Sequence, residues 1–328
     1  MVAIPQISLR SPTAALDIDA AATRFGFFQI ADHGVGLSVI NDMLQATEEF
    51  FDRPNDEKKR WASPSPEINR GYAAKGTEGL SYSLGVASVP DLFEAFNLGP
   101  DVVDPDAPWA KTPFFAPNIW PSGDHASEVF RAAVVRYFNE VGALARQLTR
   151  LFAKALDMHT DFFTTYTDHS TDTLRINHYQ RHSEEGEPQA GQLGMGPHTD
   201  YGIVTVLYAD QVPGLQILLD GDWLDVMPNP GCFLVNLGDL TAEWTNDRWQ
   251  STLHRVLPPA TGERRRSVAF FHDGNHDALV ECLPTCTSSS NPPKYPPVLA
   301  GDHLMAKLLG PRTLQPSTPT IDTSAHRR

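Results

Sequence analysis

Between residues 172 and 281 the chain is a succession of short, β-rich segments. Gly, Pro, Asp and Asn residues separate them, as expected for strands joined by tight turns. Many short strands with regular turn signals favour a sandwich or barrel of the jelly-roll kind. We therefore expect a mainly β fold with supporting helices. The segments are TLRINHY, GIVTVLY, LQILL, WLDVM, CFLVNLG, LHRVLP and RRSVAFFH.

The preceding part of the chain has a helical period instead. Residues 125–158 carry apolar side chains at steps of three and four, which predicts a long amphipathic helix that could serve as a spine for the sheets. Residues 24–30 predict a short strand, and residues 38–51 predict a second helix. The N-terminal part is therefore expected to be an α/β region.

These patterns divide the chain into three parts. Residues 1–121 form an N-terminal region whose segment 62–121, rich in Gly, Pro and Ser, is predicted to be an irregular lid. Residues 122–311 hold the spine helix, the jelly-roll core and a C-terminal helix. Residues 312–328 are polar and are predicted to be disordered.

Charge and cysteine content limit the possible partners and location. The net charge is −14, whereas nucleic acids and anionic membranes require basic patches, so neither is expected as a partner. No signal peptide or membrane-spanning run is apparent. Three cysteines are too few for a disulfide framework, so free thiols in the cytoplasm are expected.

Three short motifs could each supply two metal ligands. His-Thr-Asp occurs at 159–161 and at 198–200, and His-Ser-Glu occurs at 182–184. Only the second is followed by a β-branched run, and in a strand residues i and i+2 point to the same face. The first follows a helix and the third lies in an acidic loop, so we predict that His198 and Asp200 are the metal ligands.

A third ligand should come from another inward-facing strand. His254, in the β-like segment STLHRVLPP, is the natural candidate. Two imidazoles and one carboxylate form the facial triad of non-haem Fe(II) oxygenases, which leaves coordination positions open. The competing cluster HDGNHD at 272–277 is predicted to be a loop near the barrel mouth.

Arg265 and Ser267 share one face of the predicted strand RRRSVAFF. A guanidinium and a hydroxyl side by side form a receptor for a carboxylate. An arginine directed into an apolar barrel requires a permanent anion, and a dicarboxylate co-substrate would supply it. Arg264 and Arg266 are expected to be solvated.

With these motifs in order, the chain resembles the iron(II)/2-oxoglutarate-dependent dioxygenases of the isopenicillin N synthase-like family. The stretches IPQISL, GFFQIADHGV, GYAAKG, DLFEAFNLG, RINHYQ, PHTD, HRV and RRSVAFF carry the resemblance over nearly the whole length. One departure is Gln180, where the family usually has proline. The resemblance implies a distorted double-stranded β-helix, or jelly roll.

The resemblance also implies roles for the motif residues. His198, Asp200 and His254 would bind Fe(II), while 2-oxoglutarate would chelate the iron and reach Arg265 and Ser267 with its far carboxylate. Two further residues, Tyr179 and Asn177, would line the co-substrate side. O₂ would be reduced as 2-oxoglutarate is converted to succinate and CO₂.

Candidate substrate contacts follow from strand spacing and from the resemblance. Arg175 shares a strand face with Asn177 and Tyr179. It could bind an anionic substrate or pair with an acidic residue. The pocket wall is predicted to include the aromatic residues Phe93, Phe96 and Phe271.

Three functions are compatible with this sequence. The first is a 2-oxoglutarate-dependent hydroxylase, desaturase or cyclase that acts on a small, partly apolar molecule, as in secondary metabolism. The second is an Fe(II) oxidase of the same fold that uses no 2-oxoglutarate. The third, a non-catalytic ligand-binding jelly roll, is disfavoured by the intact triad. The sequence defines neither the substrate nor the oligomeric state.

Overall fold

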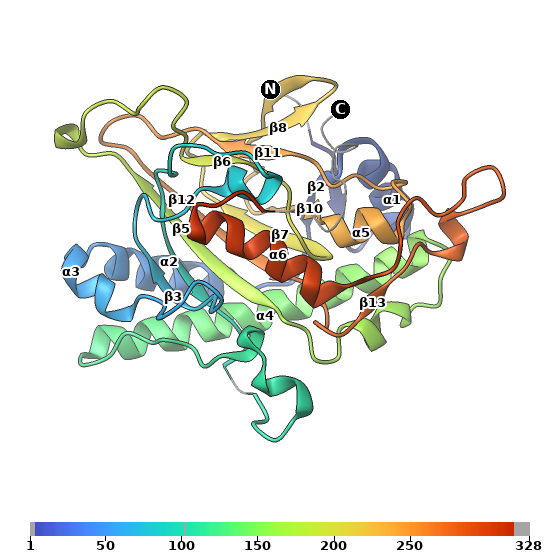
Figure 1. Ribbon diagram of the computed structural model, residues 1–328, viewed down its shortest axis with the longest axis horizontal. Helices are drawn as coiled ribbons and strands as arrows, with labels where there is room; N and C mark the ends of the chain where they lie inside the picture. Colours follow the sequence, from blue (N-terminus) through green and yellow to red (C-terminus); the bar gives the residue numbers. More distant parts are fainter. Residues whose placement is uncertain (1–3, 102, 318–328) are drawn as a thin grey trace.

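The computed structural model describes residues 4–101 and 103–317 (Figure 1). Its helices are α1 (Ala14–Phe25), α2 (Leu37–Phe51), α3 (Asn55–Lys58), α4 (His125–Ala155), α5 (Asp239–Trp244) and α6 (Ala300–Thr313). Its strands are β1 (Gln6–Ser8), β2 (Phe27–Ala31), β3 (Gly71–Ala73), β4 (Glu94–Leu98), β5 (Thr173–Gln180), β6 (Met195–His198), β7 (Val204–Ala209), β8 (Leu215–Leu219), β9 (Asp222–Asp225), β10 (Phe233–Leu237), β11 (His254–Val256), β12 (Arg264–His272), β13 (Leu279–Val280) and β14 (Val298–Leu299).

Two sheets form the jelly roll. The major sheet has the strand order β1-β2-β10-β7-β12-β5-β4-β3, and the minor sheet has the order β6-β11-β8-β9. One apolar cluster, with Tyr179, Leu215 and Val256, joins residues of both sheets, and a larger cluster joins the major sheet to the helices. The predicted jelly roll is confirmed, and each of the seven predicted segments contains an observed strand.

Helix α4 supports the outer face of the major sheet (Figure 1). Its first turn is capped by Asp124, whose carboxylate accepts a hydrogen bond from the backbone N–H of Ser127 at 2.7 Å. Its buried stripe packs on β12, where the rings of Phe138 and Phe270 meet edge to face at 5.0 Å. Gly142 allows α4 to approach β12 closely, because a Cβ at this position would lie only 3.1 Å from the Phe270 ring. The spine helix predicted over 125–158 is therefore present over 125–155.

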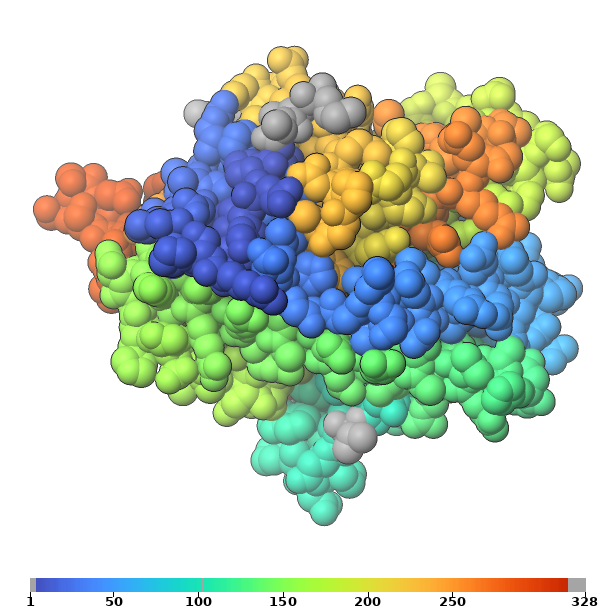
Figure 2. All heavy atoms as spheres, turned by 180° about the vertical axis from the view of Figure 1, so that it is seen from behind, coloured from blue at the N-terminus to red at the C-terminus, as the bar shows by residue number. Residues whose placement is uncertain are grey.

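The N-terminal region completes the major sheet at both edges. Strands β1 and β2 continue it beyond β10, while β3 and β4 continue it beyond β5. In the space-filling view this region lies directly against α4 and the core strands (Figure 2). Helix α1 was not predicted, and it ends at Phe25, so the strand expected over 24–30 begins later, at Phe27.

The prediction that disorder begins at residue 312 is wrong for the described residues. Helix α6 continues through Thr313, and the Arg312 guanidinium donates a hydrogen bond to the Pro66 carbonyl at 3.0 Å. The backbone N–H of Ser317 donates to the Tyr82 carbonyl at 2.9 Å. Polar composition predicts disorder only where polar groups lack partners in the fold, and here they have them. Residues 318–328 lie outside the described part.

Within residues 4–101 and 103–317, no helix combines the length and the apolar character needed to cross a membrane. The three cysteines, Cys232, Cys282 and Cys286, are free thiols.

Candidate active site

His198 and His254 are neighbours across two strands of the minor sheet. His198 ends β6 and His254 begins β11, and the two residues are paired in the register of these strands. Their ring centroids lie 4.2 Å apart. Nδ1 of His198 lies 2.8 Å from the Gly196 carbonyl, and Nδ1 of His254 lies 3.0 Å from the Thr252 carbonyl. These contacts fix both rings and leave both Nε2 atoms directed at the same point.

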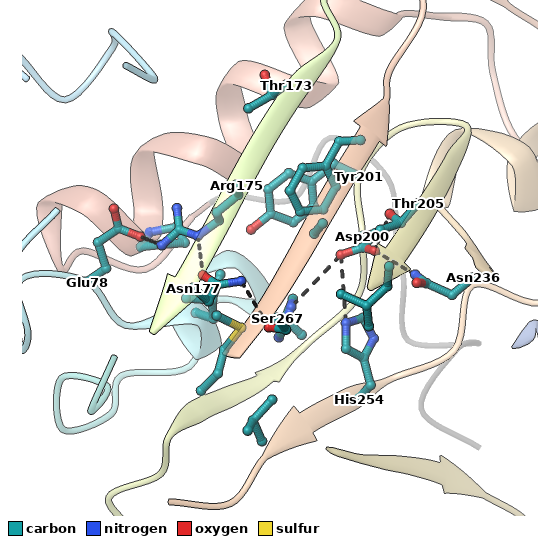
Figure 3. Close-up of a pocket in the computed structure, with 18 of the residues that line it drawn as sticks. Glu78, Thr173, Arg175, Asn177, Asp200, Tyr201, Thr205, Asn236, His254 and Ser267 are labelled. Carbon is teal, nitrogen blue, oxygen red and sulfur yellow. Dashed lines mark hydrogen bonds and ion pairs between the residues drawn. The ribbon is translucent and has the colours of Figure 1, made fainter. Parts of the chain in front are cut away.

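Asp200 completes the cluster from the connection between β6 and β7. Its Oδ1 lies 3.9 Å from Nε2 of His198 and 3.7 Å from Nε2 of His254. Figure 3 shows Asp200 directed toward His254. Its Oδ2 accepts hydrogen bonds from Thr205 and Asn236. The prediction that His198 and Asp200 share one strand is wrong, because β6 ends at His198. The two side chains converge because the chain turns.

This cluster fits a divalent metal ion. One ligand atom from each of the three buried residues lies within 4.8 Å of the other two. Burial and the neighbouring His254 lower the pKa of His198, which favours the neutral imidazole that can donate a lone pair to a metal ion. Two imidazole nitrogens and one carboxylate suit Fe(II) and leave positions for other ligands. The alternative motifs at 159–161 and 182–184 are exposed and join no such cluster among the described residues.

Arg265 provides an anion site beside this cluster. Its side chain is almost fully buried on β12, and its guanidinium lies 5.1 Å from the centre of the Tyr179 ring. Nε and Nη1 have no hydrogen-bond partner among the described residues. Leaving two buried guanidinium nitrogens without hydrogen-bond partners is costly, so the site fits a carboxylate ligand. Ser267 lies on the same face and accepts a 3.4 Å hydrogen bond from Asn177.

These groups line one cavity of about 980 Å³, including its open mouth. Arg175 extends the polar wall away from Ser267, because its Nε donates to Oδ1 of Asn177 at 3.0 Å. Its Nη2 donates to Glu78 at 2.6 Å, and Arg312 of α6 approaches the other oxygen of Glu78 at 3.9 Å. Despite burial, which opposes ionisation, the two guanidinium groups lower the pKa of Glu78. Of the two roles expected for Arg175, pairing with an acidic residue is therefore the one observed, and Glu78 is that residue.

The predicted pocket aromatics have three different positions. Phe271 lines the cavity. Phe93 lies behind the cavity wall, with its ring 4.9 Å from the Arg175 guanidinium. Phe96 packs on the opposite face of the major sheet against Phe50 and Phe130, so its prediction as a wall residue is wrong. Alternation along β4 explains this, because Ala95 and Asn97 occupy the inner face.

Sequence reasoning missed several residues of the cavity. Glu78 and Arg312 lie in segments predicted as an irregular lid and a disordered tail, so no periodic pattern marked them. Asp273, just after β12, also lines the cavity, and burial raises its pKa well above the usual range. The loop predicted at 272–277 begins one residue later, because His272 is the last residue of β12.

Comparison with known families agrees with this geometry. Residues 170–274 match the model of the 2OG-Fe(II) oxygenase superfamily, and residues 4–123 match that of the non-haem dioxygenase in morphine synthesis N-terminal region. The chain belongs to the 2OG-Fe(II) oxygenase superfamily. Its cofactors are accordingly Fe(II), 2-oxoglutarate and O₂, as the sequence predicted.

Individual relatives support the same assignment. The 2-oxoglutarate-Fe(II) type oxidoreductase hxnY of Emericella nidulans is 34% identical over 286 residues, covering 84% of this chain and 78% of that protein. Kihadalactone A synthase LFS of Citrus sinensis is 31% identical over 302 residues, covering 90% and 87%. Such relatives fit the predicted role in secondary metabolism.

A solved structure extends the likeness to the whole fold. The crystal structure of a full-length Neurospora crassa protein in complex with alpha-KG and thymine has a TM-score of 0.80 and 28% identity. The match covers 93% of this chain and 96% of that chain. The present chain is therefore a 2-oxoglutarate-dependent enzyme. None of these relatives or structures favours the alternative of an oxidase that uses no 2-oxoglutarate.

Proposed function

We propose that this oxygenase oxidises a small, partly apolar molecule that carries a carboxylate, with Fe(II) held by His198, Asp200 and His254. The observation that carries the proposal is the arrangement of one cavity. It joins the three metal ligands to the Arg265 guanidinium, whose Nε and Nη1 lack a hydrogen-bond partner among the described residues, at one side and to Arg175 and Arg312 at the other.

Arg265 and Ser267 are proposed to bind the far carboxylate of 2-oxoglutarate. The missing hydrogen-bond partners of Arg265 support this role, and Tyr179 covers the same guanidinium with its ring. Asn177 connects Ser267 to Arg175 and so separates the co-substrate end of the cavity from the substrate end. When bound, iron, 2-oxoglutarate and O₂ supply the oxidising power that removes hydrogen from a substrate C–H bond, with release of succinate and CO₂.

The protein's own contribution is to position the substrate and to exclude water. Helix α6 places apolar side chains over the cavity, which together with Phe271 and Tyr201 give it a largely apolar wall. An enclosed wall of this kind holds one C–H bond near the metal ligands. The α6 residues concerned are Leu304, Leu308 and Pro311.

Charge favours an anionic group on the substrate. Arg175 and Arg312 both line the cavity, and Glu78 contributes the carboxylate between them. Two cations against one anion leave an excess positive charge that a substrate carboxylate would balance. The Neurospora crassa protein was solved with thymine, so a neighbour of this fold accepts a small molecule, which supports a small substrate here.

Kinetics of Arg312→Met test the substrate assignment. The expected result is a KM for carboxylate substrates raised at least tenfold, because a charge-assisted hydrogen bond is lost. Succinate formed without a substrate should change little, since Arg265 is untouched. Arg264→Met, at an exposed arginine that pairs with Asp52, is the matched control and should leave KM unchanged. If Arg312→Met loses 2-oxoglutarate binding as well, the proposed division of the cavity is wrong.

The metal ligands are tested by comparing the two His-Thr-Asp motifs. Asp200→Ala should abolish turnover and weaken Fe(II) binding, because the cluster loses its carboxylate. Asp161→Ala should do neither, since Asp161 is exposed and pairs only loosely with Arg150, at 3.6 Å. Equal losses in the two variants would contradict the assignment. We also propose that the protein is cytoplasmic, because its cysteines are free thiols.

A further inference from the structure

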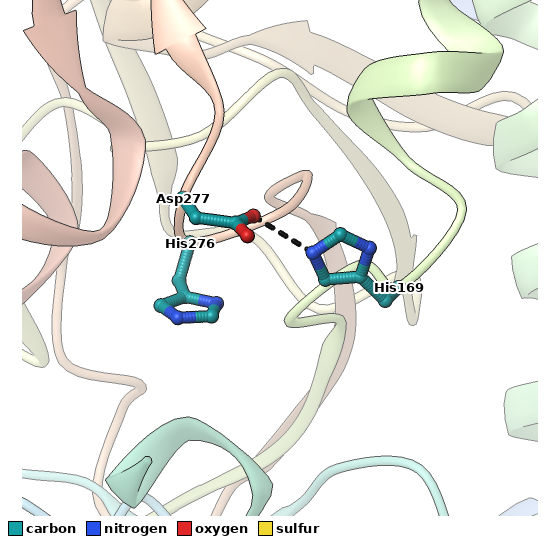
Figure 4. Close-up of side chains that lie close together, drawn as sticks. All are labelled: His169, His276 and Asp277. Carbon is teal, nitrogen blue, oxygen red and sulfur yellow. Dashed lines mark hydrogen bonds and ion pairs between the residues drawn. The ribbon is translucent and has the colours of Figure 1, made fainter. Parts of the chain in front are cut away.

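A second group of metal-ligand side chains lies outside the cavity, in the loops next to the ends of β5 and β12. His169, His276 and Asp277 each place one ligand atom within 4.8 Å of the other two (Figure 4). Nε2 of His169 lies 2.7 Å from Oδ1 of Asp277. Nδ1 of His276 is buried and has no hydrogen-bond partner among the described residues. The second imidazole thus lacks the partner that a bound cation could supply.

The surroundings of His169 are those of a prepared metal ligand. Its Nδ1 lies 2.7 Å from Oδ1 of Asp168, so a carboxylate fixes the ring and leaves Nε2 directed at the cluster. Asn275, which is 2% exposed, donates to the same Asp168 oxygen at 2.7 Å. The Asn275 side-chain oxygen also accepts the backbone N–H of His169 at 2.9 Å. A simple surface ion pair would not require this buried support.

Charge and access also suit a cation. Asp168 and Asp277 bring two negative charges to two imidazoles, which matches one divalent ion. The side chain of Asp277 is 57% exposed, so an ion could enter from solvent without opening the fold. Zn²⁺ in proteins takes imidazole nitrogen and carboxylate oxygen at about 2.0–2.2 Å, with water as a fourth ligand.

We propose that His169, His276 and Asp277 form a second metal site, separate from the iron cluster, that binds Zn²⁺ or a similar divalent transition metal ion. The site would act structurally, by joining the loop before β5 to the loop after β12, and two further segments pack on these loops. The Trp109 ring stacks on His169 with centroids 5.4 Å apart, which connects the 108–115 segment. The backbone N–H of Gly301, at the start of α6, donates to the His276 carbonyl at 2.8 Å. A bound ion would therefore stabilise the start of α6, the helix that covers the substrate cavity.

Calorimetric titration of the metal-stripped full chain with Zn²⁺ tests the proposal. The variant His198→Ala/His254→Ala serves as the background, because it removes both imidazoles of the iron cluster. One Zn²⁺ should bind per chain in this background, and its melting temperature should rise with Zn²⁺. Adding Asp277→Asn should raise the Zn²⁺ Kd at least tenfold, since a carboxylate ligand becomes a neutral amide. This exposed, isosteric change should leave the circular dichroism spectrum intact.

Further variants separate this site from adventitious binding. His276→Ala should have the same effect as Asp277→Asn. His182→Ala, at an exposed histidine beside acidic residues, is the matched control and should keep the full affinity. Titration with Co²⁺ should give visible absorption bands typical of four-coordinate nitrogen and oxygen ligation, which disappear in Asp277→Asn. Absence of Zn²⁺ binding in the background variant, or binding that persists in both site variants, would overturn the proposal.

Discussion

Arg265 illustrates how one residue defines a ligand. Its side chain is almost fully buried, two of its nitrogens lack hydrogen-bond partners among the described residues, and its guanidinium lies 5.1 Å from the centre of the Tyr179 ring. Leaving these nitrogens without partners costs free energy, which a bound carboxylate would offset. The apo protein should accordingly be less stable than the complex with 2-oxoglutarate.

Arg265→Ala should weaken 2-oxoglutarate binding by ~2–4 kcal/mol, because a charge-assisted, bidentate contact is removed. Titration of the Fe(II) protein with 2-oxoglutarate, followed by its absorption spectrum, measures the change. Arg264→Ala, one residue earlier and exposed, is the control and should bind normally. An unchanged 2-oxoglutarate affinity in Arg265→Ala would contradict the assignment of this side chain.

Glu243 is a buried acidic residue that, like Arg265, lacks hydrogen-bond partners for its polar atoms among the described residues. Both of its carboxylate oxygens lack a hydrogen-bond partner among the described residues. Burial and the nearby Asp239 and Asp247 raise its pKa to about 8 from the ordinary value of 4.5. The folded protein therefore holds the proton more tightly than the unfolded chain. The corresponding stability is complete below pH 4.5 and is lost progressively as the pH rises toward 8.

Glu243→Gln should remove this pH dependence. The variant should be more stable than wild type by about 1 kcal/mol or more at pH 8.5, with a smaller difference or none at pH 5. Denaturant unfolding at the two pH values measures the effect. Glu281→Gln, at an exposed glutamate, should change stability equally little at both. A gain of the same size at pH 5 and pH 8.5 would rule out titration of Glu243 as its cause.

Helix α6 shows how a single element is fixed to the active-site region. Its Lys307 is fully buried and forms a 3.1 Å ion pair with Asp239, at the start of α5. The backbone N–H of Asp239 in turn donates to the carbonyl of the proposed metal ligand Asp200 at 2.9 Å. The same helix presents Leu304, Leu308 and Arg312 to the cavity. Docking of α6 thus connects the substrate wall to the metal-ligand loop.

Lys307→Met should cost ~3–5 kcal/mol of unfolding free energy, because the buried Asp239 carboxylate loses a cation. Lys294→Met is the matched control, since Lys294 pairs with Asp247 at 2.9 Å but is half-exposed, and it should cost less than about 1 kcal/mol. Denaturant unfolding of the two variants decides the point. Equal effects would mean that the Lys307 ion pair does not anchor α6.

At the scale of the whole molecule, the N-terminal region and the catalytic core share one sheet. In the major sheet the core strands lie between strands of the N-terminal region, with β1 and β2 at one edge and β3 and β4 at the other. The spine helix α4 also packs on α1 and α2 from one side and on the core strands from the other. One apolar cluster contains residues of both regions, so each region covers apolar side chains of the other.

Guanidinium unfolding of the full chain should therefore give a single transition. Tryptophan fluorescence and circular dichroism should report the same midpoint, because the shared sheet couples the two regions. A fragment that begins at residue 122 should not fold, since it lacks both edges of the major sheet. Two separated transitions, or a folded fragment, would show that the boundary near residue 121 divides independent domains.

The sequence by itself determined seven of the core strands, the spine helix and the residue types of the metal and anion clusters. The spacing of hydrophobic residues is a local property of the chain. It therefore predicts β7, β10, β12 and α4 without knowledge of the segments that pack against them. The motif at 198–200 could be chosen over its duplicate because a β-branched run follows it. The spacing of Arg265 and Ser267 fixes their common face in any strand.

Only the tertiary structure decided what surrounds these clusters. Glu78 and Arg312 lie far apart in segments without a periodic pattern, and their contact depends on how α6 docks. Phe96 is apolar, as a residue of a pocket wall would be. However, side chains alternate along β4, and Phe96 lies on the face of the sheet that packs against the helices. Similarly, His169 and His276 belong to separate loops that the ends of β5 and β12 bring together. Contacts between distant segments depend on the packing of the whole chain, which local patterns do not encode.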